Sequence, residues 1–366
     1  MAILKNRYGD ISNINVINAD CLDASITFPL NSKIISNPPY GKNPSLINTS
    51  YVCAKRTKEL YVAFFEKVLY AKLPCVFITP HSFLGGNTFK ELRKELYGGK
   101  IFAFDNVPGN IFKGKKFGIF NSNEANSTRA AISILNPNEK NIYVAPFIRY
   151  KNDEREKIIS KDFLETLLPI SPQFNFGTVL YRIAPGTETI VTKWTQNKNT
   201  FNNLLSNTAT EYKLDIPNTC RYFTTASKRT LKRSGKITVY CKTLDDFYLA
   251  YAFINSSLCY YWHRMCNGGI TYPITLLKEM PIFGTVTPEL KQYCDKMLEE
   301  EEQYIVLKKN AGVYQENIKF PMEKRFHLTE LLLKQLNLSN INELKRIHNN
   351  SCLTQTIDNI EEEDEE

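Results

Sequence analysis

Residues 32–41 have the sequence SKIISNPPYG, in which a β-branched run ends in an Asn-Pro-Pro-Tyr turn. The run predicts a buried strand, which ends here because proline cannot donate a backbone hydrogen bond to a sheet. The turn presents an amide side chain at Asn37, a fixed carbonyl oxygen at Pro38 and an aromatic ring at Tyr40. Ligands of open α/β sheets bind at the carboxyl ends of strands. This turn is therefore the leading candidate binding site.

The groups of the turn suit a planar ring that carries an exocyclic amine. Such an amine is a poor nucleophile because its lone pair is delocalised into the ring. The Asn37 side-chain oxygen and the Pro38 carbonyl oxygen can accept its two hydrogens and direct the lone pair at an incoming methyl group. Tyr40 can stack on the ring, a contact that contributes ~1–3 kcal/mol per base. The alternative is that these residues form only a turn followed by an aromatic side chain.

The first 150 residues alternate apolar strand-like runs with helical patterns, which favours an α/β sheet. We expect strands at residues 13–18, 32–36, 75–79, 101–104 and 130–135. We expect helices at residues 51–73 and 88–97. The order of the strands in the sheet does not follow from these patterns.

The composition is typical of a soluble, cytoplasmic protein. No apolar run approaches the ~18 residues that span a bilayer, and the first ten residues lack the apolar stretch of a secretory signal. The nine cysteines are odd in number and form no Cys-x-x-Cys pair, so we expect reduced thiols, and no metal site. The net charge is +8 although residues 361–366 are all acidic, which suggests a polyanionic partner.

The chain resembles the S-adenosylmethionine-dependent methyltransferases that modify adenine N6 in DNA. The resemblance rests on the Asn-Pro-Pro-Tyr-Gly run at 37–41, with Asn-Ala-Asp at 18–20 and Phe-Ile-Thr-Pro at 77–80 beside it. The distal part is similar to the recognition domain of TaqI-like and related restriction-modification enzymes, at residues 221–223, 237–240, 252–258 and 276–281. Together these similarities cover roughly residues 10–285.

The resemblance implies roles for individual residues. The expected catalytic residues are Asn37, Pro38, Pro39 and Tyr40. Asp20 would accept a hydrogen bond from the adenine amine of the cofactor, with Cys21 beside it and Asn37 also contacting the cofactor. The alternative for Asp20 is a turn or helix cap.

An aromatic residue is expected on the other face of the target base. Phe112 is our choice, with Phe117 and Phe120 as rivals. All three are candidates for the core instead. A base inside a duplex cannot reach such a pocket, so the resemblance implies base flipping.

Two basic clusters are candidates for contacts with the phosphates of double-stranded DNA, which dominate affinity for nucleic acid. One borders the expected pocket and contains Lys113, Lys115 and Lys116. The other lies in the expected recognition domain and contains Lys228, Arg229, Lys232, Arg233 and Lys236. The first cluster is equally compatible with a solvated loop, and the second is better placed for phosphate contacts. Tyr272, near two glycines, is a further candidate for close approach to DNA.

The resemblance also gives a domain plan of the α/β class. We expect a partial Rossmann-like methyltransferase sheet at residues 1–150, a linker at 151–165 and an α+β DNA recognition domain at 166–285. A helical region at 286–350 and an acidic, disordered tail at 351–366 follow.

The glycine-rich loop that holds the methionine part of the cofactor in this family is missing. It does not precede Asp20, and the glycine-containing runs at 175–178, 267–270 and 283–285 do not match its pattern. We therefore expect a heterodimer, in which a second chain supplies the cofactor-binding half. A truncated chain or a catalytically silent relative are the alternatives.

The expected function is the catalytic and DNA-recognition subunit of a split, site-specific adenine-N6 methyltransferase of a restriction-modification system. Methylation of cytosine N4 uses the same amine chemistry. Methylation of glutamine or of RNA guanine also uses Asn-Pro-Pro-Tyr, but needs no basic domain of this size. The non-enzymatic alternative is a DNA-binding specificity or assembly subunit.

Overall fold

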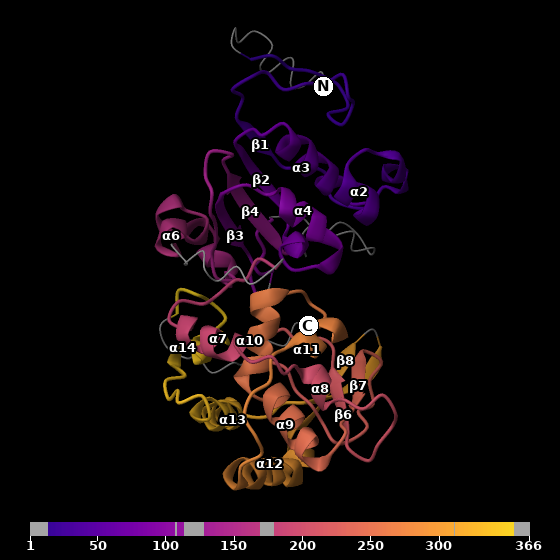
Figure 1. The fold of residues 1–366 in the computed structure, drawn as a ribbon, viewed down its shortest axis with the longest axis vertical. Helices are drawn as coiled ribbons and strands as arrows, with labels where there is room; N and C mark the ends of the chain where they lie inside the picture. Colours follow the sequence, from indigo (N-terminus) through magenta and orange to yellow (C-terminus); the bar gives the residue numbers. More distant parts are fainter. Residues whose placement is uncertain (1–13, 107, 113–127, 169–178, 311, 355–366) are drawn as a thin grey trace.

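The computed structural model describes residues 14–106, 108–112, 128–168, 179–310 and 312–354. The chain forms two lobes, which lie one above the other in Figure 1. The upper lobe holds a five-stranded sheet, and the lower lobe consists mainly of helices with two small hairpins. The chain is therefore of the α/β class, with one mixed sheet in its first part.

The order of the strands in the sheet is β1-β2-β4-β3-β5. These strands are β1 (Ile34–Ser36), β2 (Cys75–Pro80), β4 (Ala130–Leu135), β3 (Gly99–Ala103) and β5 (Ile142–Val144). β1 is parallel to β2, β5 is parallel to β3, and β4 is antiparallel to both of its neighbours. β1 is an edge strand at the end of the sheet farthest from the lower lobe (Figure 1).

Alternating side chains of the strands enter two separate cores, as the two-residue period of a strand requires. Ile101 and Ala103 of β3 pack with α2 (Val52–Thr57), α3 (Leu60–Tyr70) and α4 (Lys90–Glu95). Phe102 and Phe104 pack on the opposite face with α5 (Arg155–Ile158) and α6 (Lys161–Thr166). Figure 1 shows α3 and α4 on one side of the sheet and α6 on the other.

Most predicted elements of the first 150 residues are confirmed, with two exceptions. The strand expected at 13–18 is wrong for its described part, because residues 14–18 form no strand. The helix expected at 51–73 is divided into α2 and α3 because Lys58 adopts a left-handed conformation with φ 59°. The buried carboxylate of Glu66 then accepts the backbone N–H groups of Cys53 (2.8 Å) and Ala54 (2.7 Å), so α3 caps the start of α2.

The lower lobe is built around one hydrophobic core that extends from Ile183 to Leu344. Residues 166–285 and 286–350 both contribute to it. Its helices are α7 (Glu188–Thr195), α8 (Phe201–Leu204), α9 (Leu244–Asn255), α10 (Ser257–Cys266), α11 (Ile274–Glu279), α12 (Pro288–Glu300), α13 (Met322–Lys334) and α14 (Asn342–Arg346). Its antiparallel hairpins are β6 (Lys213–Pro217) with β7 (Lys236–Tyr240), and β8 (Ile305–Asn310) with β9 (Val313–Ile318). The second hairpin interrupts the stretch that was expected to be helical.

A buried ion network joins the two lobes. Asp105, just after β3, accepts hydrogen bonds from Arg129 (2.9 Å), Arg149 (3.0 Å) and, from α10 of the lower lobe, Arg264 (3.1 Å). Burial alone would raise the pKa of Asp105, but the three guanidinium groups outweigh it and hold that pKa well below its usual range. The network fixes the lower lobe against the carboxyl end of β3.

No helix in the described ranges is both long enough and apolar enough to cross a bilayer. No group of three or more histidine, cysteine or acidic side chains in those ranges is placed to hold a metal ion. All nine cysteines are described and none is in a disulfide.

Candidate functional site

The Asn-Pro-Pro-Tyr turn follows the carboxyl end of β1, as the sequence predicts. Pro38 is buried, Tyr40 is half-buried and Asn37 is exposed. The Tyr40 hydroxyl lies 3.0 Å from the carbonyl oxygen of Ile78 in β2 and 3.1 Å from Oδ1 of Asn37. Burial raises the pKa of Tyr40 to about 12, so the hydroxyl is a proton donor at neutral pH. Tyr40 therefore fastens the turn to β2 and orients the Asn37 amide.

The residue after the turn is a glycine whose backbone conformation is strained for any residue with a side chain. Gly41 has φ +108°, in the region that side chains rarely adopt. Its carbonyl oxygen accepts the Leu60 N–H (2.9 Å), and Lys42 forms a β-bridge with Glu59. The fold thus brings a carboxylate, Glu59, next to the turn, although it is distant in sequence. Burial raises the pKa of Glu59.

Aromatic rings surround Tyr40. Tyr61 of α3 lies edge-on to it at 6.4 Å between ring centroids, and Phe112 lies edge-on at 6.0 Å. The structure therefore brings together Tyr40 and Phe112, which are far apart in sequence. Because the two rings are inclined by 64°, a planar base can stack between them only if they rotate toward parallel and move apart. The rivals Phe117 and Phe120 lie outside the described residues.

Asp20 and Cys21 belong to an exposed turn. The Asp20 carboxylate accepts the Leu22 N–H (2.9 Å), and the Asp20 carbonyl accepts the Asp23 N–H (3.0 Å). Lys67 of α3 donates to the carbonyl oxygens of Cys21 (2.7 Å) and Asp23 (2.8 Å), which ties the turn to the sheet lobe. Asp20 thus has the turn-capping role that was the alternative at this position. A cofactor contact of Asp20 or Cys21 stays a prediction.

The residues around the turn fit only part of an S-adenosylmethionine molecule. Asn37 and Asp20 are exposed polar groups able to accept hydrogen bonds. The methionine part needs a backbone cradle of glycines, and Gly41 is the glycine of this turn. Gly85 and Gly86, after β2, pack closely on Cys266 and Phe89 instead. A cradle for the methionine part is therefore absent from the described surroundings of the turn.

The expected basic cluster of the lower lobe divides into exposed and engaged residues. Lys228 and Lys232 are exposed. Arg229 forms an ion pair with Glu302. Lys236 binds the buried carboxylate of Asp215 (2.7 Å).

Arg233 belongs to the engaged group as well. It is half-buried and donates to Gly235 (2.9 Å) and to the Asn317 side chain in β9. Arg233 joins the two hairpins, and Arg229 and Lys236 are paired with carboxylates, so Lys228 and Lys232 are the better candidates for phosphate contacts. The other cluster, Lys113, Lys115 and Lys116, lies outside the described residues.

Several expected recognition residues are parts of the core. Tyr272 is only 1% exposed, so the expectation that it approaches DNA is wrong. The Asn255 side chain accepts the Ala226 N–H (3.0 Å) and the Thr225 hydroxyl (3.0 Å). The carbonyl of Arg221 accepts the Tyr260 hydroxyl (2.6 Å). These positions build the lower lobe, and none of these contacts presents a base-reading side chain.

Residues 32–103 match the family model described as Eco57I restriction-modification methylase. The matched segment contains β1, the Asn-Pro-Pro-Tyr turn, α2 to α4, β2 and β3. The first part of the chain is thus similar to restriction-modification methylases over the candidate site and most of its sheet. A search of the curated proteins finds no match.

Solved structures give a more distant likeness. A nuclease-deletion mutant of the Type ISP restriction-modification enzyme LlaGI with a DNA substrate mimic is 12% identical, with a TM-score of 0.35 over 73% of this chain and 41% of that one. The Type ISP enzyme LlaBIII bound to DNA is 11% identical, with a TM-score of 0.32 over 75% and 30%. The DrdV–DNA complex is 16% identical, with a TM-score of 0.25 over 50% and 23%.

The chain thus spans less than half the length of these three structures.

Proposed function

We propose that this chain is the catalytic and DNA-recognition subunit of a split DNA adenine-N6 methyltransferase. The observation that carries the proposal is the position of Asn37–Tyr40. These residues follow the carboxyl end of an edge strand, inside the segment that matches restriction-modification methylases. The strand end is the place where open α/β sheets bind ligands.

The proposed chemistry uses groups that the turn already orients. The Asn37 side-chain oxygen and the Pro38 carbonyl accept the two hydrogens of the target amine, so that its lone pair points at the methyl donor. Tyr40 holds the Asn37 amide through its hydroxyl and offers a ring face to the flipped base. S-adenosylmethionine, the proposed donor, supplies an electrophilic methyl group. The amine nitrogen bonds to the methyl group through its lone pair as the sulfur–methyl bond of the donor breaks, and the methylated, cationic nitrogen then loses a proton to water. A strong base beside the amine is therefore not required.

The proposed partner chain fits the open side of the sheet. β1 pairs only with β2 among the strands of the described sheet. Ile35 of β1 is 86% exposed and stands in register with Val76 and Ile134 (41% exposed) on the neighbouring strands. An unpaired strand edge beside an exposed apolar row is a surface that proteins normally cover. We propose that a second chain covers it and brings the cofactor-binding half beside Asn37.

Reconstitution tests this function. The chain is purified from its host with any bound partner, the partner is identified, and both are expressed separately. We expect N6-methyladenine in duplex DNA only when the two chains and S-adenosylmethionine are combined. A bound partner that has no glycine-rich loop, or methylation by this chain alone, contradicts the split-site proposal.

Two alternatives share this site. The absence of a methionine cradle from the described surroundings of the turn also suits a non-catalytic DNA-binding or assembly subunit, and a cytosine-N4 methyltransferase uses the same amine chemistry. Asn37→Ala distinguishes the enzyme from a non-catalytic subunit. The variant abolishes methylation if the chain is catalytic, and it leaves DNA binding unchanged whether the chain is catalytic or not. Digestion of the methylated DNA to nucleosides separates the second, since it shows which base carries the methyl group.

A further inference from the structure

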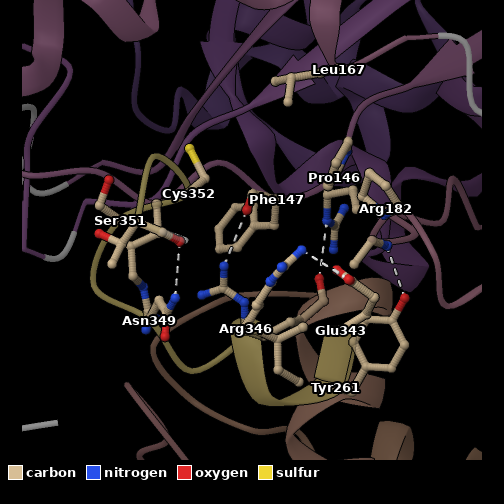
Figure 2. Close-up of a pocket in the computed structure, with 16 residues that line it drawn as sticks. Pro146, Phe147, Leu167, Arg182, Tyr261, Glu343, Arg346, Asn349, Ser351 and Cys352 are labelled. Carbon is tan, nitrogen blue, oxygen red and sulfur yellow. Dashed lines mark hydrogen bonds and ion pairs between the residues drawn. The ribbon is translucent and has the colours of Figure 1, made fainter. Parts of the chain in front are cut away.

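A cavity lies between the two lobes, away from the Asn-Pro-Pro-Tyr turn. Its volume is about 240 Å³, far more than one water molecule needs. The sheet lobe contributes Phe147 and Arg149 to its wall, and the lower lobe contributes Arg182, Arg264 and the pair Glu343–Arg346, as Figure 2 shows for the labelled residues. We call it the inter-lobe cavity.

The wall of the inter-lobe cavity carries an excess of buried positive charge. Arg149, Arg182 and Arg264 are 3%, 1% and 7% exposed. The Asp105 carboxylate pairs with Arg149, Arg264 and Arg129, so one negative charge faces three guanidinium groups. Glu343 is matched by Arg346 (2.9 Å). Burial of unbalanced charge is costly unless an opposite charge is supplied.

Two terminal nitrogen atoms of Arg182 have no hydrogen-bond acceptor among the described residues. Its Nε donates to the carbonyl oxygen of Arg264 (3.2 Å), but neither Nη1 nor Nη2 has a hydrogen-bond partner among the described residues. Nη1 of Arg149 likewise has none there. The Arg182 and Arg264 guanidinium groups both lie over the ring of Phe147, at 5.6 and 4.6 Å. Because the Nη atoms are buried in the wall, a ligand reaches them after a rotation of the Arg182 side chain.

We propose that the inter-lobe cavity binds a small molecule that carries a phosphate-type oxyanion. Guanidinium groups bind phosphate through two parallel hydrogen bonds, and the buried Nη1 and Nη2 of Arg182 would supply such a pair once the side chain has rotated into the cavity. Phe147, Leu167 and Tyr261 in the same wall leave an apolar side for an organic group. Duplex DNA does not fit this site because the three arginines are at most 7% exposed. The ligand is therefore free phosphate or a small phosphate ester.

Calorimetric titration of the full chain with inorganic phosphate and with phenyl phosphate tests this site, against sodium chloride of equal ionic strength. We expect saturable binding of phosphate, and tighter binding of phenyl phosphate if the natural ligand is an ester. Arg182→Met should weaken binding about ten- to a hundredfold, the usual effect of losing a hydrogen bond to a charged group. The same variant should unfold at a higher temperature in ligand-free buffer, because it removes an uncompensated buried charge.

Two further variants keep the test decisive. Arg346→Met leaves Glu343 unpaired in the wall and should also weaken phosphate binding, and Arg346 is exposed enough for the variant to fold. Arg56→Met, at an exposed position on α2, is the matched control and should bind phosphate normally. Lack of saturable binding, unchanged affinity in both cavity variants, or displacement of phosphate by duplex DNA would overturn the proposal.

Discussion

Tyr40 determines how the candidate site is held in the free protein. Its hydroxyl contacts both Ile78 and Asn37, so Tyr40→Phe removes the link between the turn and β2. We expect the free energy of unfolding to fall by about 1 kcal/mol, the usual contribution of one such hydrogen bond. We also expect slower methylation by the reconstituted enzyme, because the Asn37 amide loses its orienting donor.

Urea denaturation and a methylation assay measure the two effects. Tyr70→Phe is the matched control, since it removes a hydroxyl that contacts Glu66 on the other side of α3. This control should cost similar stability and leave methylation unchanged. Equal methylation by Tyr40→Phe and wild type would show that the hydroxyl does not orient the reacting group.

Among the basic residues, exposure without a carboxylate partner marks the candidates for contacts with DNA. Lys228 and Lys232 are exposed, so replacing both by alanine should weaken DNA binding and reduce the slope of log affinity against log salt by about 2. Lys236→Ala should instead lower stability, because it leaves the buried Asp215 without its nearest cation. Fluorescence anisotropy with labelled duplex at several salt concentrations measures the slope. A slope unchanged by the double substitution would exclude both lysines from the interface.

The sequence predicts local features such as turns but does not predict contacts between distant residues. The Asn-Pro-Pro-Tyr turn is visible because proline and β-branched residues act locally. The bond from Tyr40 to Ile78 joins residues far apart in the chain, and no local pattern predicts it. Burial of Tyr272 and engagement of Arg233 likewise follow from tertiary packing. The sequence alone therefore does not show which basic or aromatic residues the fold already engages.

At the scale of elements, β1 is the edge strand of the sheet that carries the candidate site. Ile35→Lys places a charge on the exposed apolar row and should abolish association with the proposed partner. The stability of the isolated chain should change little, because Ile35 is 86% exposed. Leu307→Lys, in β8 at 61% exposure, is the matched control and should retain the partner. Copurification with the identified partner gives the measurement, and full retention of the partner by Ile35→Lys would contradict this role of β1.

Strands were easier to predict than helix boundaries. The runs at 75–79 and 130–135 are apolar and bounded by polar residues, and β2 and β4 follow them closely. The break between α2 and α3 depends on the left-handed Lys58 and on the Glu66 cap, a contact between two helices. The apolar period continues through the break, so it predicts a single helix. The residues at 14–18 are apolar enough for a strand, but no described strand pairs with them.

For the molecule as a whole, the buried histidines predict how stability depends on pH. His81, His263 and His348 are at most 5% exposed, and burial lowers the pKa of each to about 3. In the unfolded chain each has a pKa of about 6.5, so unfolding takes up protons below that pH. Stability is therefore full above about pH 6.5 and falls below it, by up to ~1.4 kcal/mol per pH unit for each histidine.

Urea denaturation between about pH 8 and 5.5 measures this dependence. His348→Gln should reduce the slope of the free energy of unfolding against pH by up to ~1.4 kcal/mol per pH unit, the contribution of one proton. A stability that is constant across this range would show that the three histidines are not held neutral.

The central claim is that Asn37–Tyr40 forms the target-base half of a split DNA methyltransferase. The most direct measurement is transfer of labelled methyl groups from S-adenosylmethionine to duplex DNA, with this chain and its identified partner assayed separately and together. The account predicts labelled N6-methyladenine only when both chains are present, and none when Asn37 is replaced by alanine. Unlabelled DNA with both chains present, or labelling that survives Asn37→Ala, would contradict it.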